Sequence, residues 1–288
     1  MVLPATELRQ VETSAGPIDY VDSGGPGPVL VFGHGVPMNE TQWNPVVPHL
    51  DGYRCLRPTL PLGGHRQPMR PDADLTHHGI ARLLGEFLER LDLHEVTLVL
   101  NDWGGGQFLL LEPAGARVAR LVLVACEAFD NFPPPPARPM AQLARVPGGL
   151  WPFVQLMRLG AVRRAPWGYR AMTVRPLPDE VLIDWFAPAT RSAAIRRDFA
   201  KFSRSAPSRK AQSSWFEPLR SVRVPVLVVW ARQDTMMPPE HGPRLARHYP
   251  NARLVENDDS ATLVPWDQPE ELARVLREFL ADTGAPLA

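Results

Sequence analysis

The polar residue with the clearest chemical role lies between a run of strand-forming residues and three glycines. The stretch LVLNDWGGG, residues 98–106, ends a predicted buried strand at Asp102 and lets a helix begin almost at once. Such a sharp turn between strand and helix exposes the side chain at its centre, so Asp102 is placed to act as a nucleophile. The alternative is an ordinary turn in which Asp102 caps the following helix.

Three other stretches bring chemically useful groups to the ends of predicted strands. The apolar run PVLVFGHG, residues 28–35, leads into Val36 in a tight loop, whereas VVWARQD ends at Asp234. Glu127 directly follows the run VARLVLVAC. Asp234 and Glu127 are therefore carboxylates expected near the ends of these strands. Each also has a purely structural interpretation, Asp234 as a helix cap and Glu127 as a carboxylate at a hinge.

The elements that must position these residues alternate between strands and helices. Six strand-like runs come first, with helical spacing of apolar residues in DLTHHGIARLLGEFLERLDL, and strands resume at PVLVVWA and ARLVEN. This alternation predicts an α/β fold with a mostly parallel central sheet flanked by helices and right-handed crossovers. A helix is expected to begin at GGGQFLLLEPAG, directly after Asp102.

Between the sixth and seventh strands the pattern is helical only, and it indicates a lid. We expect a core domain of residues 1–126 and 215–288 and a helical cap domain of residues 127–214. The cap would cover the carboxyl ends of the strands, where ligands bind in open α/β sheets. Aromatic residues of this segment are candidates for substrate binding, above all Phe129, Tyr169 and Trp185.

The motifs HGVP, NDWGG, WARQD and DQPEEL occur here in the order typical of α/β-hydrolases, and the chain resembles that family over nearly its whole length. An aspartate followed by Trp-Gly is similar to haloalkane dehalogenases and epoxide hydrolases, whereas esterases would have a serine at position 102. The resemblance implies that Asp102 attacks an sp³ carbon and that water then cleaves the alkyl ester. It also implies an oxyanion hole formed by the backbone N–H groups of Val36 and Trp103, with the Trp103 indole binding halide.

The same resemblance places a histidine five positions before Asp267, and here Thr262 fills that position. An alcohol is not deprotonated near pH 7 without a partner, so Thr262 is no general base. The acid of this atypical triad would be Asp234 or Glu127. Among the chain's eight histidines, His65 is the least remote substitute, because its loop is expected at the same edge of the sheet as Asp102.

Three functions remain open from these residues. We favour an enzyme that hydrolyses an epoxide or alkyl halide with Asp102 as nucleophile. The alternatives are a non-hydrolytic catalyst of ring opening, cyclisation, elimination or rearrangement, and a ligand-binding protein without turnover.

The amino-acid composition limits the classes of molecule that the protein is expected to bind. The 288 residues carry a formal net charge of zero and only two cysteines, so no basic face and no disulfide framework are expected. We therefore expect a small hydrophobic substrate, with no nucleic acid, no membrane, no cofactor and no metal. The amino-terminal residues lack the pattern of a signal peptide, which favours a cytoplasmic protein. We also expect a monomer or a homodimer.

Overall fold

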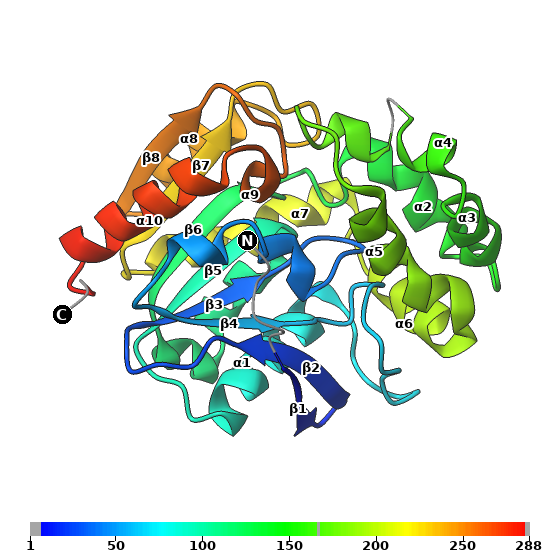
Figure 1. Ribbon diagram of the computed structural model, residues 1–288, viewed down its shortest axis with the longest axis horizontal. Coiled ribbons are helices and arrows are strands. Elements are labelled where there is room, and N and C mark those ends of the chain that lie inside the picture. Colours follow the sequence, from blue (N-terminus) through cyan, green and yellow to red (C-terminus); the bar gives the residue numbers. More distant parts are fainter. Residues whose placement is uncertain (1–6, 166–167, 286–288) are drawn as a thin grey trace.

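A twisted central sheet organises the molecule (Figure 1). The computed structural model describes residues 7–165 and 168–285. Within them, one sheet of eight strands has the order β1-β2-β4-β3-β5-β6-β7-β8. Strand β2 is antiparallel to β1 and β4, and every other pairing is parallel. The predicted α/β class and mostly parallel sheet are confirmed. The strands are β1 (Leu8–Thr13), β2 (Gly16–Asp22), β3 (Val29–Gly33), β4 (Arg54–Pro58), β5 (Val96–Asp102), β6 (Val118–Cys126), β7 (Val226–Ala231) and β8 (Ala252–Asn257).

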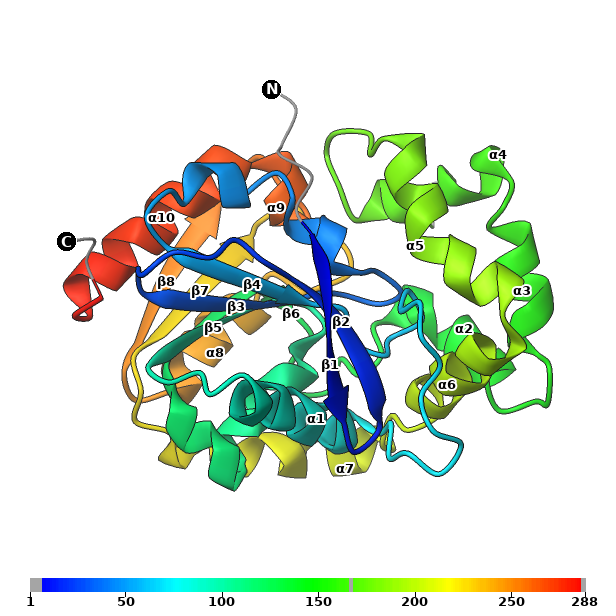
Figure 2. The ribbon, with the colours of Figure 1, turned by 60° about the horizontal axis from the view of Figure 1, so that its bottom comes forward.

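Helices cover both faces of the sheet, which explains why its central strands are apolar on both sides. Every residue of β5 and β7 is buried. Figure 2 shows α9 (Val264–Asp267) and α10 (Pro269–Asp282) on one face and α1 (His77–Arg90) and α7 (Arg209–Phe216) on the other. Helix α8 (His241–His248) packs closely on β7, since a side chain at Gly242 would collide with Trp230. None of the described helices has both the length and the apolar character needed to cross a bilayer.

The expected helix after Asp102 is a 3₁₀ helix, η3 (Gly104–Leu111), followed by a second one, η4 (Pro113–Arg117). The predicted helix is thus present, and the low α-helix propensity of three consecutive glycines explains its 3₁₀ geometry. Helix η3 packs tightly against α1, because a Cβ atom at Gly85 of α1 would lie 2.9 Å from Leu109 of η3. Eight residues are unusually many for this type of helix.

Between β6 and β7 the chain forms a group of helices beside the carboxyl ends of the central strands (Figure 1). They are α2 (Arg138–Leu143), α3 (Leu150–Leu156), α4 (Gly160–Arg163), α5 (Asp179–Arg191) and α6 (Ala193–Ser203). We call residues 138–203 the lid. Helix α7 falls partly within the predicted cap but lies near α1 under the sheet (Figure 2). The division into two domains at 127–214 stays a prediction.

Candidate active site

Asp102 is the last residue of β5, and its backbone adopts the left-handed conformation with φ of 63°. That conformation is unfavourable for a residue with a side chain and marks a sharp turn that its surroundings must hold. The backbone N–H of Glu127 donates to the Asp102 carbonyl oxygen over 2.8 Å. The Asp102 side chain comes close to the loop after β3: a Cβ atom at Gly35 would lie 2.3 Å from its carboxylate. A glycine is therefore required at position 35.

One oxygen of the Asp102 carboxylate already lies at the expected oxyanion site. The backbone N–H of Val36 donates to Asp102 Oδ2 over 2.8 Å. The neighbouring N–H of Gly35 donates to Gln42 Oε1 over 2.7 Å, and this fixes the direction of the loop. For Trp103, the other predicted donor, the backbone N–H follows Asp102 directly at the start of η3.

The Asp102 carboxyl is buried, with 5% of its surface exposed. Burial raises its pKa to about 7, and the negative charge of Asp234 contributes to the rise, whereas the N–H of Val36 opposes it. Asp102 therefore exchanges between its ionised and protonated forms near neutral pH.

Thr262 is hydrogen-bonded to the acid that the sequence places after β7. Its Oγ1 donates to Asp234 Oδ1 over 2.9 Å, and the same oxygen accepts from the backbone N–H groups of Met236 and Met237. Asp234 Oδ2 is buried without a hydrogen-bond partner. Burial outweighs the three donors and raises the pKa of Asp234 to about 6. The structure thus brings Asp234 and Thr262 together, with a hydroxyl where the family pattern has an imidazole.

Asn101 connects the loops around Asp102, a role that sequence reasoning missed. Its Nδ2 donates to the carbonyl oxygens of Thr262 and Val124 over 2.7 and 2.6 Å. Its Oδ1 accepts from Gln42 Nε2 over 2.5 Å. The loops of Thr262 and Gly35 are thereby held to the residue that precedes Asp102. A fully buried amide immediately before the predicted nucleophile was the available signal.

Glu127, the alternative acid, is buried next to the turn but has no hydrogen bond to Thr262 among the described residues. Burial and the charge of Asp102 raise the pKa of Glu127 well above the usual value. Its Oε2 is buried without a partner. The hydrogen bond of Thr262 favours Asp234 over Glu127 as the acid, and this assignment stays a prediction.

An apolar cluster, here called the lid cluster, joins side chains of the lid to Met38, Met236 and Leu263 of the catalytic loops. Tyr169 lies in it, and its hydroxyl is buried without a partner. The charge of Asp102 adds to burial in raising the pKa of Tyr169, which indicates that the two groups are close. Trp185 packs against Tyr169 with ring centroids 5.6 Å apart and donates through Nε1 to Thr41 Oγ1 over 2.9 Å. Trp266, which the sequence analysis overlooked, packs on this cluster, and its Nε1 is also buried without a partner.

Two aromatic residues expected to contact substrate lie elsewhere. The Trp103 indole N–H donates to His77 Nδ1 over 3.1 Å, within a ring of other aromatic side chains, so it is not directed at Asp102. Phe129 packs on Phe216, with centroids 4.9 Å apart, and under the Arg244 guanidinium at 3.7 Å. Both side chains belong to the main core instead of the lid cluster. Their substrate contacts stay a prediction, and the structure shows these rings packed on core partners because sequence position alone does not set side-chain direction.

The histidines do not replace the missing base. His65 is buried, and its Nε2 lies 3.4 Å from Asp198 of the lid helix α6. His77, at the start of α1, is buried against Trp103, and burial lowers its pKa to about 3. His34 uses both ring nitrogens on backbone groups, consistent with a structural role. Among the described residues, no group of three metal-type side chains is arranged to hold an ion.

Comparison with known proteins places this geometry in context. The model of the Alpha/beta hydrolase family matches residues 30–275. Haloalkane dehalogenase 1 of Mycobacterium bovis is 31% identical over 236 residues, which is 78% of this chain and 74% of the relative. A haloalkane dehalogenase of Mesorhizobium japonicum is 32% identical over 156 residues, about half of each chain (51% and 49%). The crystal structure of a haloalkane dehalogenase from Agrobacterium tumefaciens superposes with a TM-score of 0.77 over 97% of both chains at 21% identity.

Proposed function

Because this chain belongs to the alpha/beta hydrolase family, in its haloalkane dehalogenase branch, we propose that Asp102 is a nucleophile toward alkyl halides or epoxides. One observation carries the proposal: the Asp102 carboxylate is held at a strained turn with one oxygen on the Val36 N–H. That contact leaves Oδ1 to attack. The strain and the loss of solvent are what a preorganised nucleophile requires.

The first step displaces the leaving group. Asp102 Oδ1 forms a bond to the sp³ carbon as the carbon–halogen bond breaks, and halide departs with the electron pair. For an epoxide, the ring oxygen leaves the carbon instead and takes a proton, for which the buried and unpartnered hydroxyl of Tyr169 is a candidate donor. The product is an alkyl ester of Asp102, with its carbonyl oxygen on Val36 N–H.

The second step is hydrolysis of that ester, and here the chain departs from the ordinary triad. A water molecule must lose a proton as it attacks the carbonyl carbon, and Thr262 does not take it up. The only carboxylate hydrogen-bonded to Thr262 among the described residues is Asp234, with a pKa of about 6. Hydrolysis is accordingly the slow step, and the ester accumulates.

A second candidate function rests on the pKa of about 7 for Asp102. A carboxyl that is half protonated near neutral pH is suited to general acid–base catalysis. In this alternative Asp102 moves a proton in an elimination, cyclisation or rearrangement, and no covalent ester forms.

The test follows the fate of Asp102. Intact-protein mass spectrometry after incubation with 1-bromohexane and 1,2-epoxyhexane is expected to show one adduct, mapped by proteolysis to Asp102. The Asp102→Asn variant is the control and is expected to show none. Failure of any adduct to form with either reagent, together with absence of turnover, would contradict the nucleophile proposal.

Replacing Thr262 probes the missing base. In Thr262→His an imidazole is added on the loop that already contacts Asp234, and we expect the adduct to decay at least tenfold faster. Thr262→Asn is the control for size, because it adds similar bulk without a base. In water labelled with oxygen-18, hydrolysis places label in the alcohol or in Asp102. Turnover without label in either would instead support the acid–base alternative.

A further inference from the structure

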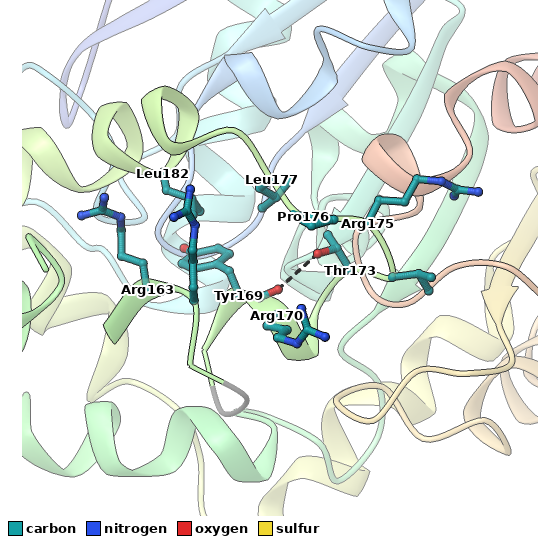
Figure 3. A pocket seen from close by; sticks show the side chains of 10 residues that line it. Arg163, Tyr169, Arg170, Thr173, Arg175, Pro176, Leu177 and Leu182 are labelled. Atoms are coloured by element: carbon teal, nitrogen blue, oxygen red, sulfur yellow. Dashed lines mark hydrogen bonds between the residues drawn. The ribbon is translucent and has the colours of Figure 1, made fainter. Parts of the chain in front are cut away.

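A cavity of about 290 Å³ opens in the lid beside Tyr169 (Figure 3). Its wall is formed by the segment from α4 to the start of α5. Leu177, Leu182 and Tyr169 form an apolar part of the wall. The ionisable side chains that line it, apart from Tyr169, are all arginines: Arg163, Arg164, Arg170 and Arg175.

The arginines are only partly neutralised. Arg163 and Arg164 share one carboxylate, Asp179, at 3.4 and 2.8 Å, and Arg175 pairs with Asp259 at 2.6 Å. The exposed pairs made by Arg164 and Arg175 contribute little free energy and can be replaced by contacts with a bound anion. Arg170 is exposed and has no ion pair among the described residues, and the Nε of the buried Arg163 has no hydrogen-bond partner. The arginines at the mouth of the cavity therefore have N–H groups that are available to bind an anion.

The apolar wall of the cavity belongs to a cluster that reaches residues beside the candidate active site. Tyr169, Leu177 and Leu182 belong also to the apolar cluster that contains Leu263, next to Thr262, and Met236, close to Asp234. The charge of Asp102 acts on the Tyr169 hydroxyl. The wall is also bound to the catalytic loop, since the backbone N–H of Leu263 donates to the Met172 carbonyl oxygen over 2.8 Å.

The whole lid strengthens the positive potential at this mouth. Residues 138–203 contain 11 arginines and lysines but only 4 aspartates and glutamates, a net charge of +7. Because the complete chain is neutral, the remainder has a net charge of −7. Like charges around a cleft with apolar walls concentrate the field in it and attract ions of opposite sign.

We propose that the lid cavity binds the anionic head of an amphiphilic substrate, a carboxylate, sulfate or phosphate ester, whose apolar tail extends past Tyr169 toward Asp102. Arg170 and Arg164 contact the head group, and the apolar cluster holds the tail. The inference deepens the proposed function by naming a substrate class. Binding of the head group does not itself require Asp102 to react.

Binding of octanoate and of octanamide to the unmodified protein provides the test, measured by isothermal titration calorimetry. The two probes share a tail length and differ in the charge of the head. We expect octanoate to bind at least fivefold more tightly in 50 mM NaCl and to lose that advantage in 500 mM NaCl, where the charges are screened. Equal affinity of the two probes at low salt would overturn the proposal.

Single substitutions locate the site. Arg170→Gln is expected to weaken octanoate about fivefold and to leave octanamide unchanged, in line with the loss of one charge-assisted contact. Arg204→Gln is the matched control, because it removes one exposed lid-side charge outside the cavity. If Arg204→Gln weakens octanoate as much as Arg170→Gln, the attraction is a general field effect and the cavity is not the site.

A reaction series separates this inference from the proposed function. Alkylation of Asp102 by bromoalkanoates of four to ten carbons is compared with alkylation by the matching bromoalkanamides. Faster alkylation by the bromoalkanoates than by the bromoalkanamides, with this difference lost in Arg170→Gln, supports both the nucleophile and the anion-binding cavity. Absence of any Asp102 adduct, with octanoate still bound in an Arg170-dependent manner, refutes the nucleophile while the cavity assignment stands.

Discussion

Burial of Asp102 has two opposing effects on its reactivity as a nucleophile. Burial beside the apolar lid makes the carboxylate a less solvated and stronger nucleophile, but it also raises the pKa to about 7, so a fraction of the protein is protonated at neutral pH. The N–H of Val36 offsets part of this cost because it stabilises the anion. The reactive form is therefore controlled by pH within the physiological range.

The rate of Asp102 alkylation should follow that ionisation. Only the carboxylate attacks carbon, so below pH 7 we expect the initial rate of adduct formation to fall about tenfold per pH unit, with a plateau above pH 8. Mass spectrometry of samples quenched at early times measures the rate. A rate that is level from pH 5 to 9 would contradict an active-site carboxyl of pKa about 7.

Thr262 stabilises Asp234 in its charged form. In Thr262→Val the hydroxyl is lost while shape is kept, so the pKa of Asp234 should rise further and the free energy of unfolding should drop by about 1–2 kcal/mol at pH 8. The loss should be smaller at pH 5, below the pKa of about 6, where Asp234 is protonated. Urea unfolding at the two pH values measures both, with Thr262→Ser, which keeps the hydroxyl, as the control. Equal losses at pH 5 and pH 8 would argue against a role in holding the charge.

At the scale of elements, one buried side chain fastens the lid to the catalytic loop. Asp267 accepts hydrogen bonds from the backbone N–H groups of Val174 and Arg175 in the lid and of Ala261 beside Thr262. The family pattern has an acid at this position. Its contacts here explain the residue type, because a carboxylate can accept several N–H groups at once.

Removing that charge should loosen the lid segment locally. In Asp267→Asn one acceptor oxygen becomes a donor, so we expect amide hydrogen exchange at Val174 and Arg175 to be at least tenfold faster and stability to decrease by about 2 kcal/mol. Hydrogen exchange followed by mass spectrometry compares the segment 172–176 with α10. Asp259→Asn, which alters the exposed contacts of that carboxylate with Arg175 and Gln268 but leaves Asp267 in place, is the control and should leave these amides unchanged.

The sequence was informative where local pattern and long-range packing agree. The alternation of strands, the stripe on α1 and the position of Asp102 all follow from residue type and spacing, and the structure has them. The direction of a side chain does not follow in this way. Trp103 and Phe129 lie next to predicted site elements, but their rings turn into the core because His77 and Phe216 offer complementary partners there. Asn101 was missed for the same reason, since its hydrogen bonds join segments far apart in the chain.

At the scale of the whole molecule, charge is distributed unevenly between the lid and the remainder of the chain, although the net charge is zero. A formal charge of zero led us to expect no basic face, but the lid alone has +7 and the rest of the chain −7. The lid lies beside one end of the sheet, so the opposite charges are also separated in space (Figure 1). This separation gives the molecule a strong electric dipole, and its positive end covers the candidate site.

The same buried carboxyls determine how folding stability depends on pH. The pKa values of Asp102 and Asp234 rise from an unfolded value of 3.8 to about 7 and about 6. Between these limits the folded protein holds protons that the unfolded chain has released, so both groups lower stability as pH increases from about 4 to about 7. From pH 5 to pH 8, Asp102 alone accounts for a loss of about 3 kcal/mol.

Asp102→Asn removes this dependence because an amide does not ionise. We expect the difference in free energy of unfolding between the variant and the unmodified protein to shift in favour of the variant by about 3 kcal/mol between pH 5 and pH 8. Urea unfolding at both pH values gives the difference, and other titrating groups cancel in the comparison. Asp51→Asn, at an exposed position, is the matched control and should show no such shift. If Asp102→Asn and Asp51→Asn behave alike, Asp102 is ionised without cost in the folded state, and its proposed burial beneath the lid is wrong.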